Sequence, residues 1–201
     1  NDASSDRSGA LRTANAAGKY ADAVLGGNVF IGSTLVAGVA HGTALTGTHV
    51  TAGLWNPPGS GKLLVVLKAV VTYQTGTLGA GGAWCWAQIA QFAAPTTITR
   101  RAVINALLDG ASSTTGTQGS GAKGQFVEVG TLIAAPTLVR GSVLIFPQLG
   151  TTAIVPTMQI DEVDGELVVG QGVFLALQGV VGGAGTSPLQ QVAITWEEVD
   201  A

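Results

Sequence analysis

The chain has few charged side chains. Of its 201 residues, 9 are Lys or Arg and 12 are Asp or Glu, which gives a formal net charge of −3. Nine basic residues provide no basic field for a phosphate backbone, so we do not expect nucleic acid as a partner. Because 46% of the residues are hydrophobic and only 10% are charged, polar side chains are too scarce to cover the surface. We expect part of the apolar surface to be shared with neighbouring molecules.

Cysteine and long hydrophobic runs are also scarce. Cys85 is the only cysteine, so no internal disulfide can form and cysteine pairing gives no information about the compartment. No apolar run reaches the roughly 18 residues that a membrane-spanning helix needs, because Lys68 and glycine clusters interrupt the longest candidates. We therefore expect no membrane partner.

The stretch from Leu54 to Tyr73 organises the rest of the chain. Asn56 to Gly61, with the sequence NPPGSG, has no hydrophobic period, and its two prolines lack backbone donors, which predicts a turn. Leu63 to Val71 follows and is almost entirely apolar and β-branched, with Lys68 as the interruption. This pattern predicts a central strand that is buried on both faces.

The remaining segments predict an all-β protein with an N-terminal arm. Residues 1–27 are expected to form the arm, partly extended, with a short helix between about Ala10 and Leu25 as an option. Residues 28–201 are expected to form one antiparallel β-sandwich domain, because eight to ten short strands alternate with Gly and Pro turns. A jelly-roll-like winding is favoured for this size. Further strands are expected at 28–39, 44–54, 83–92, 125–132, 142–147, 165–169, 173–181 and 191–199.

The sequence does not assign a single type of structure to one segment and predicts a loop for another. Thr96 to Leu108 fits either a strand or a short helix, and the sequence leaves both open. Gly110 to Gly124 is rich in Gly, Ser and Thr, which indicates a long surface loop and a candidate contact loop.

Gly59-Ser60-Gly61-Lys62 invites comparison with a phosphate-binding loop. The first glycine of that motif is replaced by Asn56, and Lys62 is followed by Leu63 instead of Ser or Thr. A strand is also expected where the motif needs a helix N-terminus. The segment is therefore interpreted as a plain turn.

Asp161 to Glu166 is an acidic cluster with four acids in six residues. Val163 occupies a position where a calcium loop of the EF-hand type needs an oxygen ligand, so a solvated hairpin turn is the favoured interpretation. A glycosidase-like carboxylate pair is the less favoured alternative, because acids close together on one turn seldom face a common cleft.

The two histidines and the cysteine have structural interpretations. His41 and His49 could serve a catalytic triad, but no Gly-x-Ser-x-Gly segment presents a nucleophile, so both are expected to be polar strand or loop residues. Cys85 has no cationic sequence neighbour that would lower its pKa, which favours a buried structural thiol.

Aromatic and basic residues are the remaining candidates. Trp84 and Trp86 are two residues apart on an expected strand and therefore share a face. A core or subunit-interface role is favoured over a sugar-stacking platform. Arg100, Arg101 and Arg140 are expected to be solvated or interfacial instead of catalytic. No catalytic, cofactor-binding or metal-binding residue is assigned, and no cofactor is expected.

Three segments together resemble a group of tailed-bacteriophage virion proteins. They are the Gly18-Lys19-Tyr20 to Gly27-Asn28-Val29-Phe30 segment, the Leu54 to Leu63 turn, and the C-terminal Val192 to Val199 segment. The chain departs from the group's pattern at Pro58, where a small residue is common.

The resemblance implies a structural role on the surface of a phage particle, without enzymatic activity. The favoured function is a capsid decoration or cement protein that acts as a homo-oligomer, with a trimer favoured, and contacts the major capsid protein or other virion proteins. A tail- or fibre-associated module that binds a host glycan or a tail protein is the first alternative. A carbohydrate-active enzyme that uses Asp161 to Glu166 is the second.

Overall fold

A computed structural model of the chain describes residues 4–5, 11–12, 18–42, 44–48, 50–76, 82–96, 99–108, 121–146, 158–181 and 188–201. Its helix is α1 (Ala21–Leu25). The strands of its first half are β1 (Ser4–Ser5), β2 (Leu11–Arg12), β3 (Val29–Ser33), β4 (Val50–Asn56), β5 (Lys62–Thr75) and β6 (Gly82–Ala90). Those of its second half are β7 (Thr99–Arg100), β8 (Val103–Asn105), β9 (Gln125–Gly130), β10 (Thr137–Phe146), β11 (Met158–Glu162), β12 (Val168–Val169), β13 (Val173–Val181) and β14 (Leu189–Asp200).

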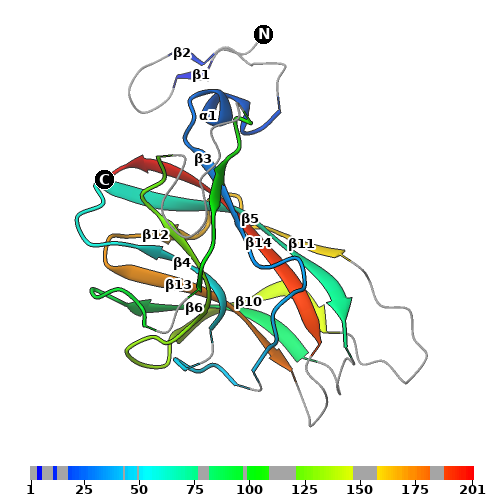
Figure 1. Cartoon of the computed structure of the whole chain (residues 1–201). Coiled ribbons are helices and arrows are strands. Elements are labelled where there is room, and N and C mark those ends of the chain that lie inside the picture. Colours follow the sequence, from blue (N-terminus) through cyan, green and yellow to red (C-terminus); the bar gives the residue numbers. More distant parts are fainter. Residues whose placement is uncertain are drawn as a thin grey trace.

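Two antiparallel sheets form a β-sandwich (Figure 1). The first, here called the β5 sheet, has the strand order β11-β5-β14-β3-β8, and β12 also pairs with β5. The second, here called the β4 sheet, has the order β10-β6-β13-β4-β9-β7. The short pair β1 and β2 forms a separate two-stranded sheet. The sequence-based prediction of an all-β antiparallel sandwich is therefore confirmed.

Within each sheet, strands from the start of the sandwich pair with strands from its end. β3 pairs with β14, β4 with β13, β5 with β11 and β6 with β10, all antiparallel. These pairs fall alternately in the β5 sheet and the β4 sheet. The segment between β6 and β10 adds β8 beside β3 and β9 beside β4, so it widens both sheets on the same side of the molecule.

Inward side chains of both sheets make one core. Strand alternation places Leu64, Val66, Ala69 and Val71 of β5 in this core, together with the fully buried Trp84, Trp86 and Trp196. β5 shifts its register against β14 between Val66 and Lys68, so Leu67 is an extra residue and the inward positions change parity there. The core thus depends on one bulge in its central strand.

The opposite side of β5 is only partly covered, which corrects the prediction that this strand is buried on both faces. Its outward side chains Val65, Lys68 and Val70 are half-buried. We call the outward side of this sheet the outer face of the β5 sheet. It comprises Leu63, Val65, Lys68, Val70 and Thr72 with their cross-strand neighbours Val29, Ile31, Ser33, Ile104, Met158, Ile160, Glu162, Val168, Gln191, Ala193, Thr195, Glu197 and Val199.

The outward side of the β4 sheet is covered by its own chain. Trp55, Val127 and Phe174 lie there in a second hydrophobic cluster with Leu132. The indole nitrogen of Trp55 donates to the carbonyl of Gln91 (2.8 Å), and the backbone nitrogen of Leu132 donates to the carbonyl of Gly47 (2.7 Å). The loops that contain Gly47, Gln91 and Leu132 therefore form a third layer over this sheet.

Several sequence-based expectations about the other segments change. The helix expected near Ala10 to Leu25 is confined to α1, and residues 13–17 lie outside the described part. Thr96 to Leu108 contains two short strands, β7 and β8, and no helix among its described residues. Gly110 to Gly124 lies outside the described residues except for 121–124.

The close approach of β4 and β13 gives a stability prediction. A Cβ added to Gly53 would lie 2.5 Å from the ring of Phe174 and 2.6 Å from the carbonyl oxygen of Leu175. Gly53→Ala should therefore lower the free energy of unfolding by about 1–3 kcal/mol, as measured by urea denaturation. Gly141→Ala is the matched control on β10, because nothing lies within 4 Å of its added Cβ. Equal stability of the two variants would contradict this packing.

Candidate functional site

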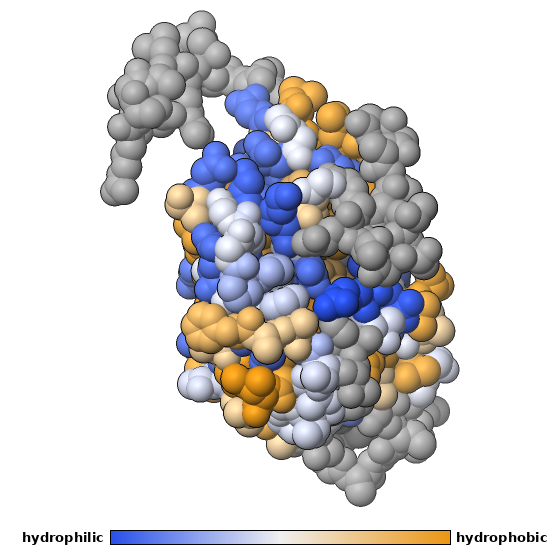
Figure 2. Space-filling model, turned by 60° about the vertical axis from the view of Figure 1, so that its left-hand side comes forward, coloured by the Kyte–Doolittle hydropathy of each residue, from blue (hydrophilic) through white to orange (hydrophobic). Residues whose placement is uncertain are grey.

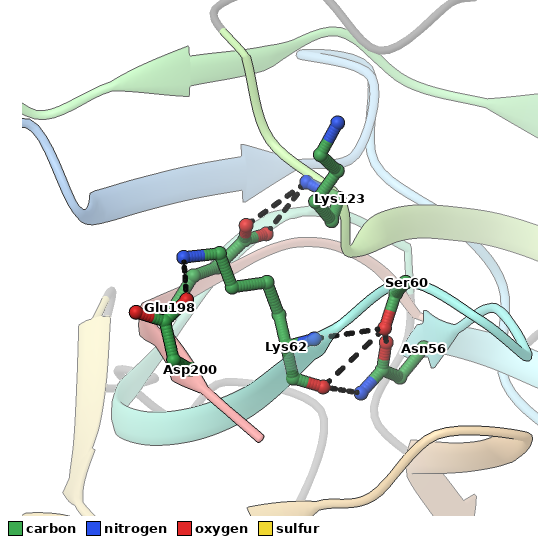
Figure 3. Close-up of polar contacts among 6 residues, drawn as sticks. All are labelled: Asn56, Ser60, Lys62, Lys123, Glu198 and Asp200. Carbon is green, nitrogen blue, oxygen red and sulfur yellow. Dashed lines mark hydrogen bonds and ion pairs between the residues drawn. The ribbon is translucent and has the colours of Figure 1, made fainter.

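The turn between β4 and β5 is held together by its own polar groups (Figure 3). The side-chain amide of buried Asn56 donates to the carbonyls of Lys62 (2.8 Å) and Val169 (3.0 Å). The hydroxyl of Ser60 donates to the side-chain oxygen of Asn56 (2.6 Å). Gly59 and Gly61 have φ angles of 74° and 72°, which favour glycine. The NPPGSGK segment is thus a closed structural turn.

This geometry supports the interpretation of Gly59 to Lys62 as a plain turn. The ammonium group of Lys62 lies 2.6 Å from the carboxylate of Asp200 on β14, and the chain continues directly into β5. A phosphate-binding loop would instead present its lysine and its backbone N–H groups at the start of a helix.

Beside the turn, Glu198 fixes the end of the glycine-rich segment (Figure 3). Its buried carboxylate accepts hydrogen bonds from the backbone nitrogens of Lys123 (2.9 Å) and Gly124 (2.7 Å) and from the indole of Trp196 (3.3 Å). These donors satisfy a carboxylate that would be costly to bury alone. Glu198 therefore fastens the entrance of β9 to the last strand of the chain.

The acidic cluster contains the expected turn, with Glu162, Asp164 and Glu166 exposed, but the turn does not close a hairpin and Asp161 is not solvated. Asp161 is buried on β11, where it accepts hydrogen bonds from Trp86 Nε1 (2.9 Å) and Ser142 Oγ (2.6 Å). β11 and β12 both pair with β5, so the turn between them is an interruption of one edge strand. The run of acidic residues indicated a turn, but Asp161 and Glu162 belong to the strand β11, and the side chain of Asp161 points into the core.

Arg140 links the acids of this cluster. Its guanidinium lies 3.5 Å from Asp161 and 3.2 Å from Glu166. Because Trp86, Ser142 and Arg140 come from β6 and β10 of the other sheet, Asp161 joins the two sheets at this edge. Asp161 and Glu166 are each held by a partner, an arrangement unlike a glycosidase pair facing a shared cleft.

Asp164, an exposed acid of the same turn, anchors residues 18–25 at the base of the expected arm. Its carboxylate accepts a hydrogen bond from the hydroxyl of Tyr20 and lies 2.5 Å from the ammonium group of Lys19. Lys19 and Tyr20 together lower the pKa of Asp164, and Asp164 raises the pKa of Lys19. We call this three-residue contact the arm anchor. The arm anchor joins the Gly18-Lys19-Tyr20 segment to the acidic cluster, a contact that the sequence did not predict.

Another ion pair stabilises the opposite side of the sandwich. Arg101 binds the buried carboxylate of Glu128 through two nitrogens, at 2.7 and 2.9 Å, and the backbone nitrogen of Leu35 also donates to Glu128 (2.8 Å). The hydrogen bonds to Glu128 raise the pKa of Arg101. Arg100 is exposed and bonds Gln125 (2.7 Å). Arg101 and Arg140 therefore act as structural cations, while Arg100 is solvated.

The remaining candidates occupy structural positions. His41 is buried with its ring edge against Trp84, at 4.6 Å between centroids, and His49 lies outside the described residues. Trp84 and Trp86 are fully buried in the core, which leaves neither indole on a sugar-binding surface. Cys85 faces the other way and is half-buried, and this partial burial raises the pKa of its thiol.

An apolar groove of about 300 Å³ lies where β12 of one sheet meets β13 of the other. Leu167 and Val169 line one side and Val173 and Leu175 the other, with Gln88 and Glu166 as its polar groups. Within the described part of the chain, no cluster of three or more His, Cys, Asp or Glu is placed to bind a metal ion. The same part contains no helix that is long and apolar enough to span a membrane.

Comparisons with protein-family models, with curated proteins and with solved structures give no significant match. The resemblance to phage virion proteins that the sequence suggests therefore stays a prediction.

The arm anchor predicts a pH-dependent attachment of residues 18–25. Because the pKa of Asp164 lies below its ordinary value of 3.8, its stabilising contribution is present above that value and is lost as the pH falls through the lowered pKa. The raised pKa of Lys19 makes its contribution present below 10.5 and lost as the pH rises further. Attachment should therefore be strongest between about pH 4 and 10.

Hydrogen exchange of the α1 amides, followed by mass spectrometry, measures this attachment. Asp164→Asn should accelerate exchange several-fold at pH 7, because the charge that attracts Lys19 is removed. Asp200→Asn removes an exposed carboxylate of a comparable surface ion pair with Lys62 and is the control. Unchanged α1 exchange in Asp164→Asn would show that the anchor does not hold this segment.

Proposed function

We propose that this protein is a structural component of a tailed-bacteriophage particle, specifically a capsid decoration protein that binds the shell through oligomeric contacts. One observation carries the proposal: large apolar side chains are exposed on a chain with few charges. Leu108 is 81% exposed, Val36 76%, Phe92 71% and Ile133 69%. Exposed apolar area of this kind marks surfaces that other proteins cover.

These side chains occur on several elements instead of one pocket. Leu35 and Val36 follow β3, Phe92 follows β6, and Ile133 precedes β10. Figure 2 shows apolar residues gathered toward the lower end of one side of the molecule, below a band of polar residues. A protein held by many copies of neighbouring subunits has contacts on several sides, which fits this distribution.

The strand pairing supports the same proposal. We infer a jelly-roll winding, because the eight strands that pair first with last alternate between two sheets. Double-sheet jelly rolls are frequent in viral capsid domains, although they also occur in lectins and cupins. The fold alone therefore gives only analogy, and the motif resemblance and the apolar surface give the direction.

The arm anchor gives the proposed arm a fixed origin. Lys19 and Tyr20 hold residues 18–25 against the turn of Asp164, so residues 1–17 join the body at a defined point. A segment that orders when it binds a neighbour adds contact area at a cost in conformational entropy. We propose that residues 1–17 bind an adjacent virion subunit in this way.

Removal of residues 1–17 tests the arm. The truncated chain should keep its circular dichroism spectrum and unfolding midpoint, because the core and the arm anchor lie after residue 17. Its co-sedimentation with phage shells that lack the protein should fall at least tenfold. A chain in which residues 1–17 are replaced by a Gly/Ser segment of equal length is the control for length. Undiminished binding by both variants would exclude a role of the arm sequence.

The position of the protein on the particle tests the proposed function itself. A reconstruction of purified virions should show copies repeated over the shell, between or above capsid subunits. Copies restricted to the tail vertex would support the tail-associated alternative. Absence of the protein from purified virions would refute a structural role in the particle.

A further inference from the structure

Apolar side chains occur on every strand of the outer face of the β5 sheet, from β11 to β8. One cross-strand row places Ile160, Val70 and Ala193 side by side, and the next places Thr195, Ile31 and Ile104 beside Lys68. Toward the turn end, Val168 lies opposite Val65. A sheet that faces water on one side normally alternates apolar inward with polar outward residues. This sheet instead carries many apolar side chains on its outward side as well, mixed with polar ones.

Exposure confirms that this face differs from the outward side of the β4 sheet. Met158 is 56% exposed, Val168 53% and Ile160 43%, while the central Val70 is half-buried. On the β4 sheet, the outward Trp55 and Phe174 are only 6% and 0% exposed, because loops of the chain cover them. The chain thus covers Trp55 and Phe174 on one sheet, whereas on the outer face of the β5 sheet it buries Val29 and Thr195 but leaves Met158, Val168 and Ile160 exposed.

Three charged residues interrupt the outer face. Lys68 on β5 lies opposite Glu162 on β11, and Glu197 on β14 is its diagonal neighbour. Among the ion pairs of the described residues, none includes Lys68, Glu162 or Glu197. The face therefore carries both a cation and two carboxylates that are available to a partner.

We propose that a second copy of this chain packs on the outer face of the β5 sheet. Two apolar sheet faces pack about 10 Å apart in sandwiches, and the same geometry joins two protomers face to face. The charges favour a copy over an unrelated partner. Each Lys68 already has Glu162 of its own chain opposite it, whereas Glu197 is an additional carboxylate. A two-fold contact that places Lys68 of each protomer beside Glu197 of the other would satisfy both charges on burial.

The size of the face approaches that of a protein interface. β5 and β14 supply about ten residues each, and the shorter strands β3, β8, β11 and β12 supply about fifteen together. At about 3.3 Å per residue and about 4.8 Å between strands, these give roughly 500–600 Å² per copy. A standard stable interface has about 800 Å² per partner. The turn of the arm anchor adjoins the face, since a Cβ on Gly165 would lie 3.2 Å from Val65. Residues near the anchor would thus add area at its margin.

Sedimentation analysis of the full chain tests this contact. The wild-type chain should sediment as a dimer or a multiple of one at micromolar concentration. Val70→Glu, at the centre of the face, should weaken association at least 100-fold, whereas Phe92→Glu, at an apolar and more exposed position outside the face, should leave it unchanged. A monomeric wild type, or dissociation by Phe92→Glu without any effect of Val70→Glu, would overturn the proposal.

A charge exchange identifies the partner as a second copy. Lys68→Glu should weaken association by opposing Glu162 and Glu197, and adding Glu197→Lys should restore most of it. Because both positions point outward, each variant should fold with an unchanged circular dichroism spectrum, so this pair decides the question even if Val70→Glu does not fold. Failure of the double variant to recover any association would argue against the two-fold contact.

This inference rests on the proposed function only for its biological setting. Self-association through this face in a protein absent from virions would uphold the contact and refute the virion role. A virion protein that is monomeric in solution and keeps this face free on the shell would do the opposite.

Discussion

The antiparallel ladder between β5 and β14 is the interaction on which the rest of the structure depends. It runs from the Lys62–Asp200 pair at one end to the Thr75–Leu189 pair at the other, and β14 also pairs with β3. Its inward residues, including Val66, Ile194 and Trp196, form the centre of the core. Because strands alternate, the same ladder fixes the outward residues, so the core and the outer face are set by one register.

Three acidic residues of this chain are buried and stabilise its interior. Asp161, Glu128 and Glu198 are buried, and each accepts hydrogen bonds from segments distant in the sequence. Asp161 joins the two sheets, Glu128 holds the β3–β4 connection to Arg101, and Glu198 holds the start of β9. Three of the 12 acids are thus removed from a surface that already has little charge.

This use of acids also explains the apolar character of the exterior. A carboxylate buried with several donors contributes to a unique arrangement of loops, but it no longer hydrates the surface. The outward residues of β5 and β11 are then left with Lys68 and Glu162 as their charged members. We propose that another protein subunit covers this surface.

The fold could be predicted from the sequence because its main signals are local. Gly and Pro punctuation and β-branched runs placed most strands, including β5, β6, β13 and β14, close to their observed positions. β11 was missed because Asp161 and Glu162 suggest a turn, and only the tertiary contacts with Trp86 and Ser142 explain a buried Asp161. Likewise, the contact of Lys19 and Tyr20 with Asp164 joins positions 144 or more residues apart, which no local pattern encodes.

The apolar run of β5 predicts a strand buried on both faces, but in the single chain its outward face is only half-buried. Leu63 to Val71 has the composition of a strand buried on both faces, yet Val65 and Val70 are only half-buried. A contact with a second copy would complete the burial that the sequence predicts. The central claim is therefore that this face is covered by protein in the assembled state.

Oxidation of Met158 by hydroxyl radicals, read by mass spectrometry, tests this claim most directly, because Met158 is the only methionine and lies on the outer face with 56% of its surface exposed in the single chain. The account predicts that Met158 is protected at high protein concentration and becomes oxidised several-fold faster on dilution, while exposed Phe92 is modified at the same rate in both conditions. Oxidation of Met158 at a rate independent of concentration would contradict it.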